Sequence, residues 1–115
     1  MDEPPRIRES REMFARALDS GVTIANGSDV GVFAHGNNVR ELELMVAYGM
    51  DPADALRAAT AVAAGVLNRQ DELGQIAEGY VADLIAVRKD PLDDPSALRQ
   101  PVLVIREGRI VVQPR

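Results

Sequence analysis

The sequence contains no cysteine and no tryptophan, and aromatic residues make up only 3% of its 115 positions. The absence of cysteine excludes disulfide bonds, thiolate catalysis and cysteine-ligated zinc sites. With so few aromatic side chains, any hydrophobic core must consist of aliphatic residues and alanine. We therefore expect a small core, in a chain whose length matches one ordinary domain.

Positive charge is also scarce, since thirteen Lys and Arg residues face eighteen Asp and Glu residues and leave a net charge of −5. Nucleic-acid-binding surfaces need clustered basic residues, so we expect no nucleic-acid partner. No apolar run approaches the roughly 20 residues that span a bilayer, so we expect no membrane partner. The polar N-terminal segment shows no signal peptide, and together these features predict a cytoplasmic protein.

Three segments have the apolar spacing of helices. The first runs from Ile7 to Asp19, and the second from Asn38 to Tyr48, where Asn38 and Glu41 resemble a capping box. The third runs from about Asp51 to Leu67, because Asp51 precedes a proline at the first helical position. We expect the inner face of this third helix to consist of Leu56, Ala59, Thr60, Ala63 and Leu67.

Short strands are predicted on both sides of these helices. The β-branched run Val22–Ala25 is typical of a strand buried between layers. After residue 72 the apolar period changes to two, and Glu107–Gly108 predicts a hairpin turn. The further strands expected there are Leu73–Ile76, Ala82–Val87, Val102–Ile105 and Ile110–Val112. These patterns predict an α/β fold, or α+β for the isolated chain, with a helical half in residues 1–70 and a β half in residues 71–115.

The glycine-rich turn after Val22–Ala25 presents one carboxylate, Asp29. Reactive groups of α/β proteins lie where strands end at the carboxyl edge of a sheet. Asp29 can therefore be a metal ligand or general base, or a turn carboxylate bonded to its own backbone. His35, the only histidine, follows in the same loop, although a lone loop histidine is most often a surface or packing residue.

Other candidate residues have less specific signals. Ser28 has no nearby histidine to act as its base, and its loop lacks the Gly-Lys-Ser/Thr ending of a phosphate-binding loop. Glu41 and Glu43 are expected to be capping or solvated groups. Asp83, inside an apolar run, is expected to be a buried carboxylate that fixes an adjacent turn.

Taken in order, nine segments resemble the C-terminal part of metal-dependent amidohydrolases, in the branch of imidazolonepropionases and Xaa-Pro dipeptidases. Each segment alone is a weak motif, but their common order over nearly the whole chain is specific. The segments are Gly27–Gly31, Ala34–Gly36, Arg40–Leu44, Gly49–Leu56, Ala58–Thr60, Leu73–Gly79, Ala82–Leu84, Asp90–Leu92 and Gly108–Val111.

The resemblance implies the last strand and helices of a (β/α)8 barrel, with C-terminal strands of a small β-sandwich. Val22–Ala25 would match the eighth barrel strand, and residues 71–115 the sandwich. Asp29 would match the aspartate that binds the metal, zinc or another divalent ion, and accepts a proton from the attacking water. His35 would lie near the substrate, which the resemblance implies is a small amide, cyclic amide or dipeptide.

The remaining metal ligands of the family have no counterpart in this sequence. They are a His-x-His pair, a carboxylated lysine or glutamate, and two further histidines. A catalytic zinc needs about three protein ligands, so we expect the isolated chain to bind no metal stably and to be inactive. We expect its apolar surfaces to be covered by another copy of itself or by a complementing barrel chain. The alternative is a non-catalytic, self-associating structural fragment.

Overall fold

A computed structural model describes residues 3–31 and 34–113. Residues 1–2, 114–115 and 32–33, the last pair inside the predicted loop Asn26–Asn37, lie outside the described part. The elements are α1 (Pro5–Asp19), α2 (Val39–Ala47), α3 (Pro52–Ala59), α4 (Ala61–Val66), β1 (Leu84–Ala86), the 3-10 helix η1 (Pro95–Arg99), β2 (Leu103–Arg106) and β3 (Arg109–Val112). The fold is thus mixed α/β with a small antiparallel sheet.

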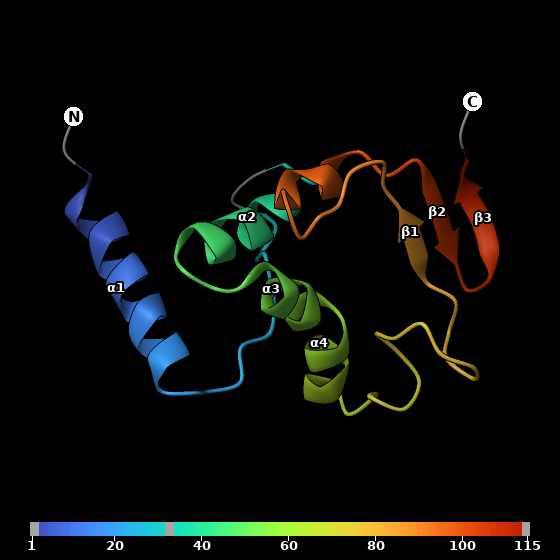
Figure 1. The fold of residues 1–115 in the computed structure, drawn as a ribbon, viewed down its shortest axis with the longest axis horizontal. Helices are drawn as coiled ribbons and strands as arrows, with labels where there is room; N and C mark the ends of the chain where they lie inside the picture. The colour runs from blue at the N-terminus through green and yellow to red at the C-terminus, as the bar shows by residue number, and fades with distance from the viewer. Residues whose placement is uncertain (1–2, 32–33, 114–115) are drawn as a thin grey trace.

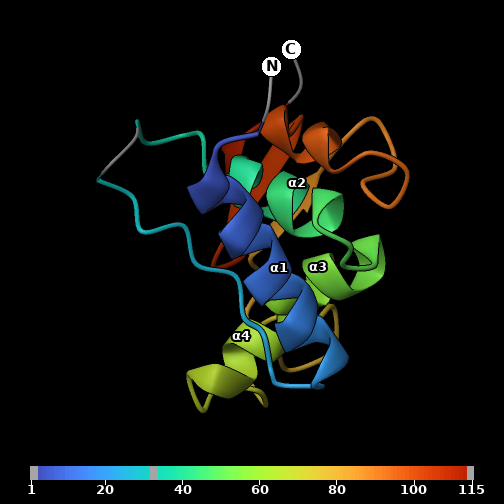
Figure 2. The ribbon, with the colours of Figure 1, turned by 90° about the vertical axis from the view of Figure 1, so that its left-hand side faces the viewer.

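Helix α1 and the sheet occupy opposite ends of the molecule (Figure 1). Helix α1 lies at one end, the sheet lies at the other, and α2, α3 and α4 lie between them. Turned by 90°, the molecule shows α1 in front of the other helices (Figure 2). Among the described residues, no helix is long and apolar enough to cross a membrane.

The core lies where α2, α3 and α1 meet. Leu42 and Met45 on α2 are buried against the alanines of α3, and Phe14 and Leu18 of α1 pack on this cluster. Helix α1 contributes no buried residue of its own, so it is a cover over the core. In the part of the chain that the structure describes, the buried residues are Leu42, Met45, Met50, Ala55, Ala58 and Ala64. The expectation of a small aliphatic core is therefore confirmed.

The predicted helix Asp51–Leu67 is wrong in its middle, because Thr60 divides it into α3 and α4. Thr60 has φ −126° and ψ −97°, and its hydroxyl donates to the carbonyl of Leu56 at 2.7 Å. Such back-bonding by threonine competes with helical geometry. The start is as predicted, since the Asp51 side chain accepts a hydrogen bond from the Ala53 N–H at 2.8 Å.

The predicted inner face of this helix is wrong in part, although Ala59 does pack against the core. Alanines Ala55, Ala58 and Ala64 are buried, whereas Leu67 is 65% exposed. Ala55 and Ala58 of α3 belong to the same core cluster as Leu42 and Met45 of α2. Their small side chains let the two helices approach closely.

The sheet has the order β1-β2-β3, and both pairs are antiparallel. The predicted hairpin at Glu107–Gly108 is confirmed, with φ of 49° and 76°, as a two-residue turn of positive φ requires. Asp83 does fix this turn, since its Oδ1 accepts from the Glu107 N–H at 2.8 Å. Asp83 is exposed rather than buried.

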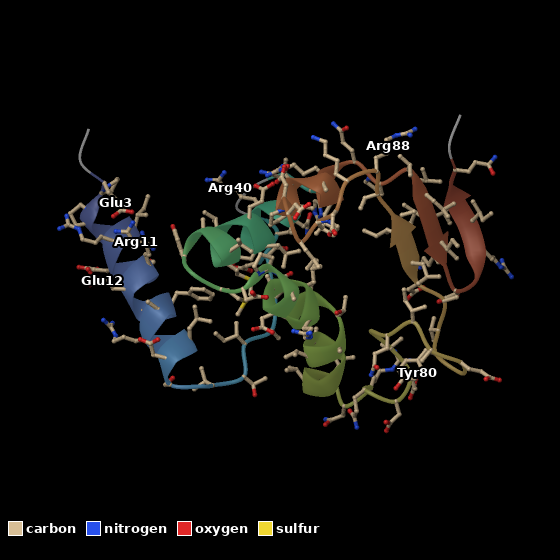
Figure 3. The ribbon with its side chains drawn as sticks, in the orientation of Figure 1. Glu3, Arg11, Glu12, Arg40, Tyr80 and Arg88 are labelled. Atoms are coloured by element: carbon tan, nitrogen blue, oxygen red, sulfur yellow. The ribbon has the colours of Figure 1, made fainter. Side chains whose placement is uncertain are left out.

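Two predicted strands do not form among the described residues. Val22–Ala25 pairs with no strand, and the next N–H, of Asn26, donates to the carbonyl of Ala58 at 2.9 Å. A strand needs a neighbour for its ladder, and the described residues offer none beside this segment. Leu73–Ile76 forms turns instead, with Gly74 at φ 82°. Tyr80 joins these turns, and its hydroxyl donates to the carbonyl of Gln70 at 3.0 Å (Figure 3).

Candidate functional site: the Asp29 loop

Asp29 lies on the exposed loop between α1 and α2 with an unusual backbone conformation. Its φ is 43°, in the left-handed region that only a few per cent of non-glycine residues adopt. Within the described part of the chain, its carboxylate accepts no hydrogen bond, and the residue is exposed. Among the residues described, the carboxylate is thus free of partners, and the local backbone bonding considered for Asp29 is not seen there.

His35 lies on the far side of the same loop. It is exposed, in a turn followed by Gly36 at φ 92°. Along the chain, the two candidates lie on either side of residues 32 and 33, which are outside the described part. Their roles as metal ligand and substrate contact remain predictions.

One side chain joins the two ends of this loop. The Asn38 Nδ2 donates to the Ser28 hydroxyl at 3.0 Å, and its Oδ1 accepts from the Gly36 N–H at 3.2 Å. Ser28 directly precedes Asp29, and Gly36 directly follows His35. The predicted capping role of Asn38 is wrong, because it makes no side-chain cap bond to α2.

A second contact ties the loop to distant parts of the chain. Arg99 on η1 donates two hydrogen bonds to the carboxylate of Glu43 on α2, from Nε at 2.6 Å and from Nη2 at 2.7 Å. Its Nη1 donates to the Asn37 Oδ1 at 2.6 Å. The hydrogen bond from Arg99 lowers the pKa of the Glu43 carboxyl, and Glu43 in turn raises the pKa of Arg99. Glu43 is therefore an anchoring group and not the freely solvated residue expected from the sequence.

A cation site cannot be assembled from the described residues alone. No group of three or more His, Cys, Asp or Glu side chains in this part of the chain could hold a metal ion. Asp29 provides one oxygen-donor side chain, whereas a catalytic zinc takes about three protein ligands. The donors present in the described ranges therefore do not fit a complete metal centre.

Two of the surface hollows in the described part of the chain lie away from the Asp29 loop. One, of about 480 Å³, is lined in part by the basic side chains of Arg88, Lys89 and Arg99. The other, of about 560 Å³, lies between α3 and the extended segment after α1, and includes Leu18, Val22 and Met50. Arg88, which lines the first hollow, lies between η1 and the sheet (Figure 3). Neither lining includes Asp29 or His35.

Comparison with known proteins identifies the class. Residues 4–111 match the amidohydrolase family, so this chain belongs to that family. Its members are generally metal-dependent enzymes. The resemblance to metal-dependent amidohydrolases is therefore confirmed over nearly the whole chain.

Particular relatives narrow the branch. A Xaa-Pro dipeptidase solved with bound methionine in its active site superposes with a TM-score of 0.86 at 40% identity, over 89% of this chain and 25% of that one. Ochratoxinase from Aspergillus niger is 41% identical over 93 residues, which are 79% of this chain and 19% of the enzyme. Its crystal structure gives a TM-score of 0.79 at 33% identity, over 90% of this chain and 24% of that one.

The chain thus spans about a fifth to a quarter of the length of these relatives, and the match falls on their C-terminal part. The Xaa-Pro dipeptidase side of the resemblance is confirmed. Its imidazolonepropionase side, the barrel and sandwich assignment of the segments, and the division at residues 70–71 remain predictions.

Proposed function

We propose that this chain contributes the Asp29 loop to a metal-dependent hydrolase that cleaves C–N bonds of small amides, cyclic amides or dipeptides. The observation that carries the proposal is the match of residues 4–111 to the amidohydrolase family. The similarity to a Xaa-Pro dipeptidase at 40% identity supports it. In this role Asp29 is a metal ligand and proton acceptor, and His35 contacts the substrate. The metal is zinc or another divalent ion.

The geometry supports Asp29 as the group that the chain contributes. Its carboxylate is exposed, has no hydrogen-bond partner among the described residues and is held in a strained conformation. Strain of this kind costs on the order of 1–3 kcal/mol and clusters at functional sites. Because the donors in the described ranges are too few for a metal centre, the remaining ligands must come from residues outside them.

We accordingly expect the isolated chain to be inactive. The purified 115-residue protein should contain no stoichiometric zinc, and it should not hydrolyse Xaa-Pro dipeptides or cyclic amides. Metal analysis and product assays measure both properties. Stoichiometric zinc together with turnover that is lost in Asp29→Asn would contradict this expectation and would make the chain an enzyme by itself.

A chimera tests the contribution of Asp29 directly. Residues 4–111 replace the matching segment of Aspergillus niger ochratoxinase, and the chimera is assayed on the host's own substrate. We expect activity in the parent chimera and a loss of kcat by at least about 100-fold in Asp29→Asn, the usual scale for a general base. Asp71→Asn, another exposed carboxylate, is the matched control. Full activity in Asp29→Asn would refute the assigned role.

A non-catalytic, self-associating structural protein is the second candidate. The observation in its favour is the set of large apolar side chains left at the surface, which includes Ile76, Ile110 and Val111. We favour a second copy of this chain as the partner that covers them, and a complementing barrel chain is the alternative. Self-association of the isolated chain, combined with a chimera that folds but stays inactive, would favour this candidate over the hydrolase.

A further inference from the structure

Asn38 occupies the N-cap position of α2 without capping the helix. Its backbone is already helical, with φ −62° and ψ −27°, whereas a capping residue is usually extended so that its side chain reaches the following N–H groups. Both polar atoms of the Asn38 amide instead bond to the preceding loop, one as donor to Ser28 and one as acceptor from Gly36. The side chain is therefore used by the loop rather than by the helix.

The two partners of Asn38 flank the two candidate site residues. Ser28 is the residue before Asp29, and Gly36 is the residue after His35. A single amide thus closes the segment that carries both groups. Closing a loop of this length restricts the range of end-to-end distances that its chain would otherwise sample.

The bridge itself is anchored on the rest of the fold. Asn37, next to Asn38, accepts a 2.6 Å hydrogen bond from Arg99, whose other two bonds hold Glu43 on α2. The anchor therefore joins the loop, α2 and η1. Pairs in which a guanidinium holds a carboxylate with two parallel bonds have a defined geometry. Asn38 is thus placed by a contact that does not involve Asp29 or His35.

We infer that Asn38 is a positioning residue that sets the spatial relation between Asp29 and His35. The chemical meaning of that relation rests on the proposed function. The bridge that Asn38 forms between Ser28 and Gly36 is independent of that function. Asn38 acts through these neighbours and touches neither candidate site group among the described contacts.

The composition of the chain allows a direct measurement. There is no cysteine and only one histidine, so Gly27→Cys gives a single spin-label site and the His35 imidazole gives a single set of NMR signals. A Cβ at Gly27 meets nothing within 4 Å, so the label should be tolerated. The paramagnetic relaxation enhancement of the His35 signals then reports how close the two sides of the loop remain.

We expect Asn38→Ala to change this enhancement by about twofold or more, because the loop is no longer closed. Asn38→Asp should retain the parent value, since its carboxylate oxygens can accept from both the Gly36 N–H and the Ser28 hydroxyl. Ser28→Ala should change the enhancement in the direction of Asn38→Ala while leaving the start of α2 intact. Gln113→Ala, at an exposed residue of the C-terminal end, should have no effect.

Equal enhancement in the parent, Asn38→Ala and Ser28→Ala would overturn the inference. If Asn38→Ala fails to fold by circular dichroism, Ser28→Ala alone decides. In the chimera, Asn38→Ala should lower kcat on the order of 10-fold while Asn38→Asp restores it, because small misplacements of catalytic groups have large costs. A changed enhancement in a chimera indifferent to Asp29→Asn would leave the positioning role intact and refute the proposed function instead.

Discussion

Gly74 is the residue at which one added carbon atom would meet the backbone most directly. Its φ is 82°, and a Cβ would lie 2.6 Å from the carbonyl oxygen of Thr60 and 2.7 Å from its carbonyl carbon. The turn after α4 therefore packs against the residue that divides α3 from α4. Only glycine combines this positive φ with so close an approach.

Gly74→Ala is expected to destabilise the protein by more than Gly79→Ala. Both residues have positive φ, but a Cβ at Gly79 meets nothing within 4 Å. The control should cost about 1–3 kcal/mol of backbone strain, and Gly74→Ala should add the cost of moving the Thr60 backbone. Urea unfolding of the two variants measures the difference. Equal losses in free energy of unfolding would show that the contact is relieved without cost.

Glu43 gives the stability of the protein a dependence on acid. Its pKa is lowered in the folded state, chiefly by the hydrogen bond from Arg99, relative to the usual value of 4.5. Its contribution is therefore complete above pH 4.5 and is lost as the pH falls through the lowered pKa. We expect Glu43→Gln to reduce the fall in urea midpoint between pH 7 and pH 3, by a small amount because the pair is partly exposed.

Asp93→Asn, which removes another exposed carboxyl group, is the control for this titration. The pKa of the Asp94 carboxyl should be the same in the parent and in both variants, because hydrogen bonds from Ser96 lower it in each of them. An identical fall in midpoint for the parent and Glu43→Gln would be incompatible with the assignment.

At the scale of elements, α2 provides the buried side chains on which the other helices pack. Leu42 and Met45 are 7% and 4% exposed, and they contact the alanine face of α3 and the cover formed by α1. The edge-to-face pair of Phe14 and Tyr48, with ring centroids 6.4 Å apart, joins α1 to the end of α2. Truncation of the buried α2 side chains should therefore weaken the packing of both α1 and α3.

Leu42→Ala is expected to lower the free energy of unfolding by about 2–5 kcal/mol, the usual cost of a core leucine. Leu67→Ala, at a side chain that is 65% exposed, should change it by less than about 0.5 kcal/mol. Chemical denaturation of both variants provides the comparison. If Leu42→Ala lowered the free energy of unfolding by less than about 1 kcal/mol, half of the smallest usual cost, Leu42 would not be a core residue.

Elements with local signals could be predicted from the sequence. The first two helices, the Asp51 cap and the Glu107–Gly108 hairpin each depend on neighbouring residues, and all of them form. Val22–Ala25 could not be predicted correctly, because a strand exists only with a partner. Part of the inner face of α3, Ala55 and Ala58, was missed for a related reason, since its burial is decided by how closely α2 approaches.

The candidate site shows the same division. Asp29 and His35 were identified from a loop motif and a family resemblance, which are readable along the chain. The contact between Arg99 and Asn37 spans 62 residues, and no spacing or motif around Arg99 indicates it. The amide of Asn38 can both donate and accept, and the sequence predicts its most frequent local role, the N-cap. Its hydrogen bonds to Ser28 and Gly36 depend on the path of the loop, which no local motif indicates.

At the scale of the whole molecule, the chain is more open than a compact domain. Its radius of gyration is 15.5 Å, against about 13 Å expected for this length. Helix α1 and the sheet lie at the two ends of a 46 Å long axis (Figure 1). All four residues of the outer strand β3 are exposed, and exposed edge strands tend to pair with other chains.

We expect the purified chain to associate above its monomer mass of 12.4 kDa, increasingly with concentration. Val111→Lys on β3 should reduce this association, because charge on an edge strand opposes pairing. Ile76→Lys, in a turn at a side chain that is 90% exposed, is the control and should have a smaller effect. Light scattering coupled to gel filtration measures the mass. A monomer at every concentration would contradict the expectation.

The alanine-lined contact between α2 and α3 has a thermodynamic consequence. Of the six buried residues in the ranges 3–31 and 34–113, three are alanines, so unfolding newly hydrates little hydrocarbon. The heat-capacity increment of melting follows the apolar area exposed, and it averages about 12–15 cal/mol/K per residue in ordinary domains. This chain should fall below that range, and its calorimetric transition should be correspondingly broad and shallow.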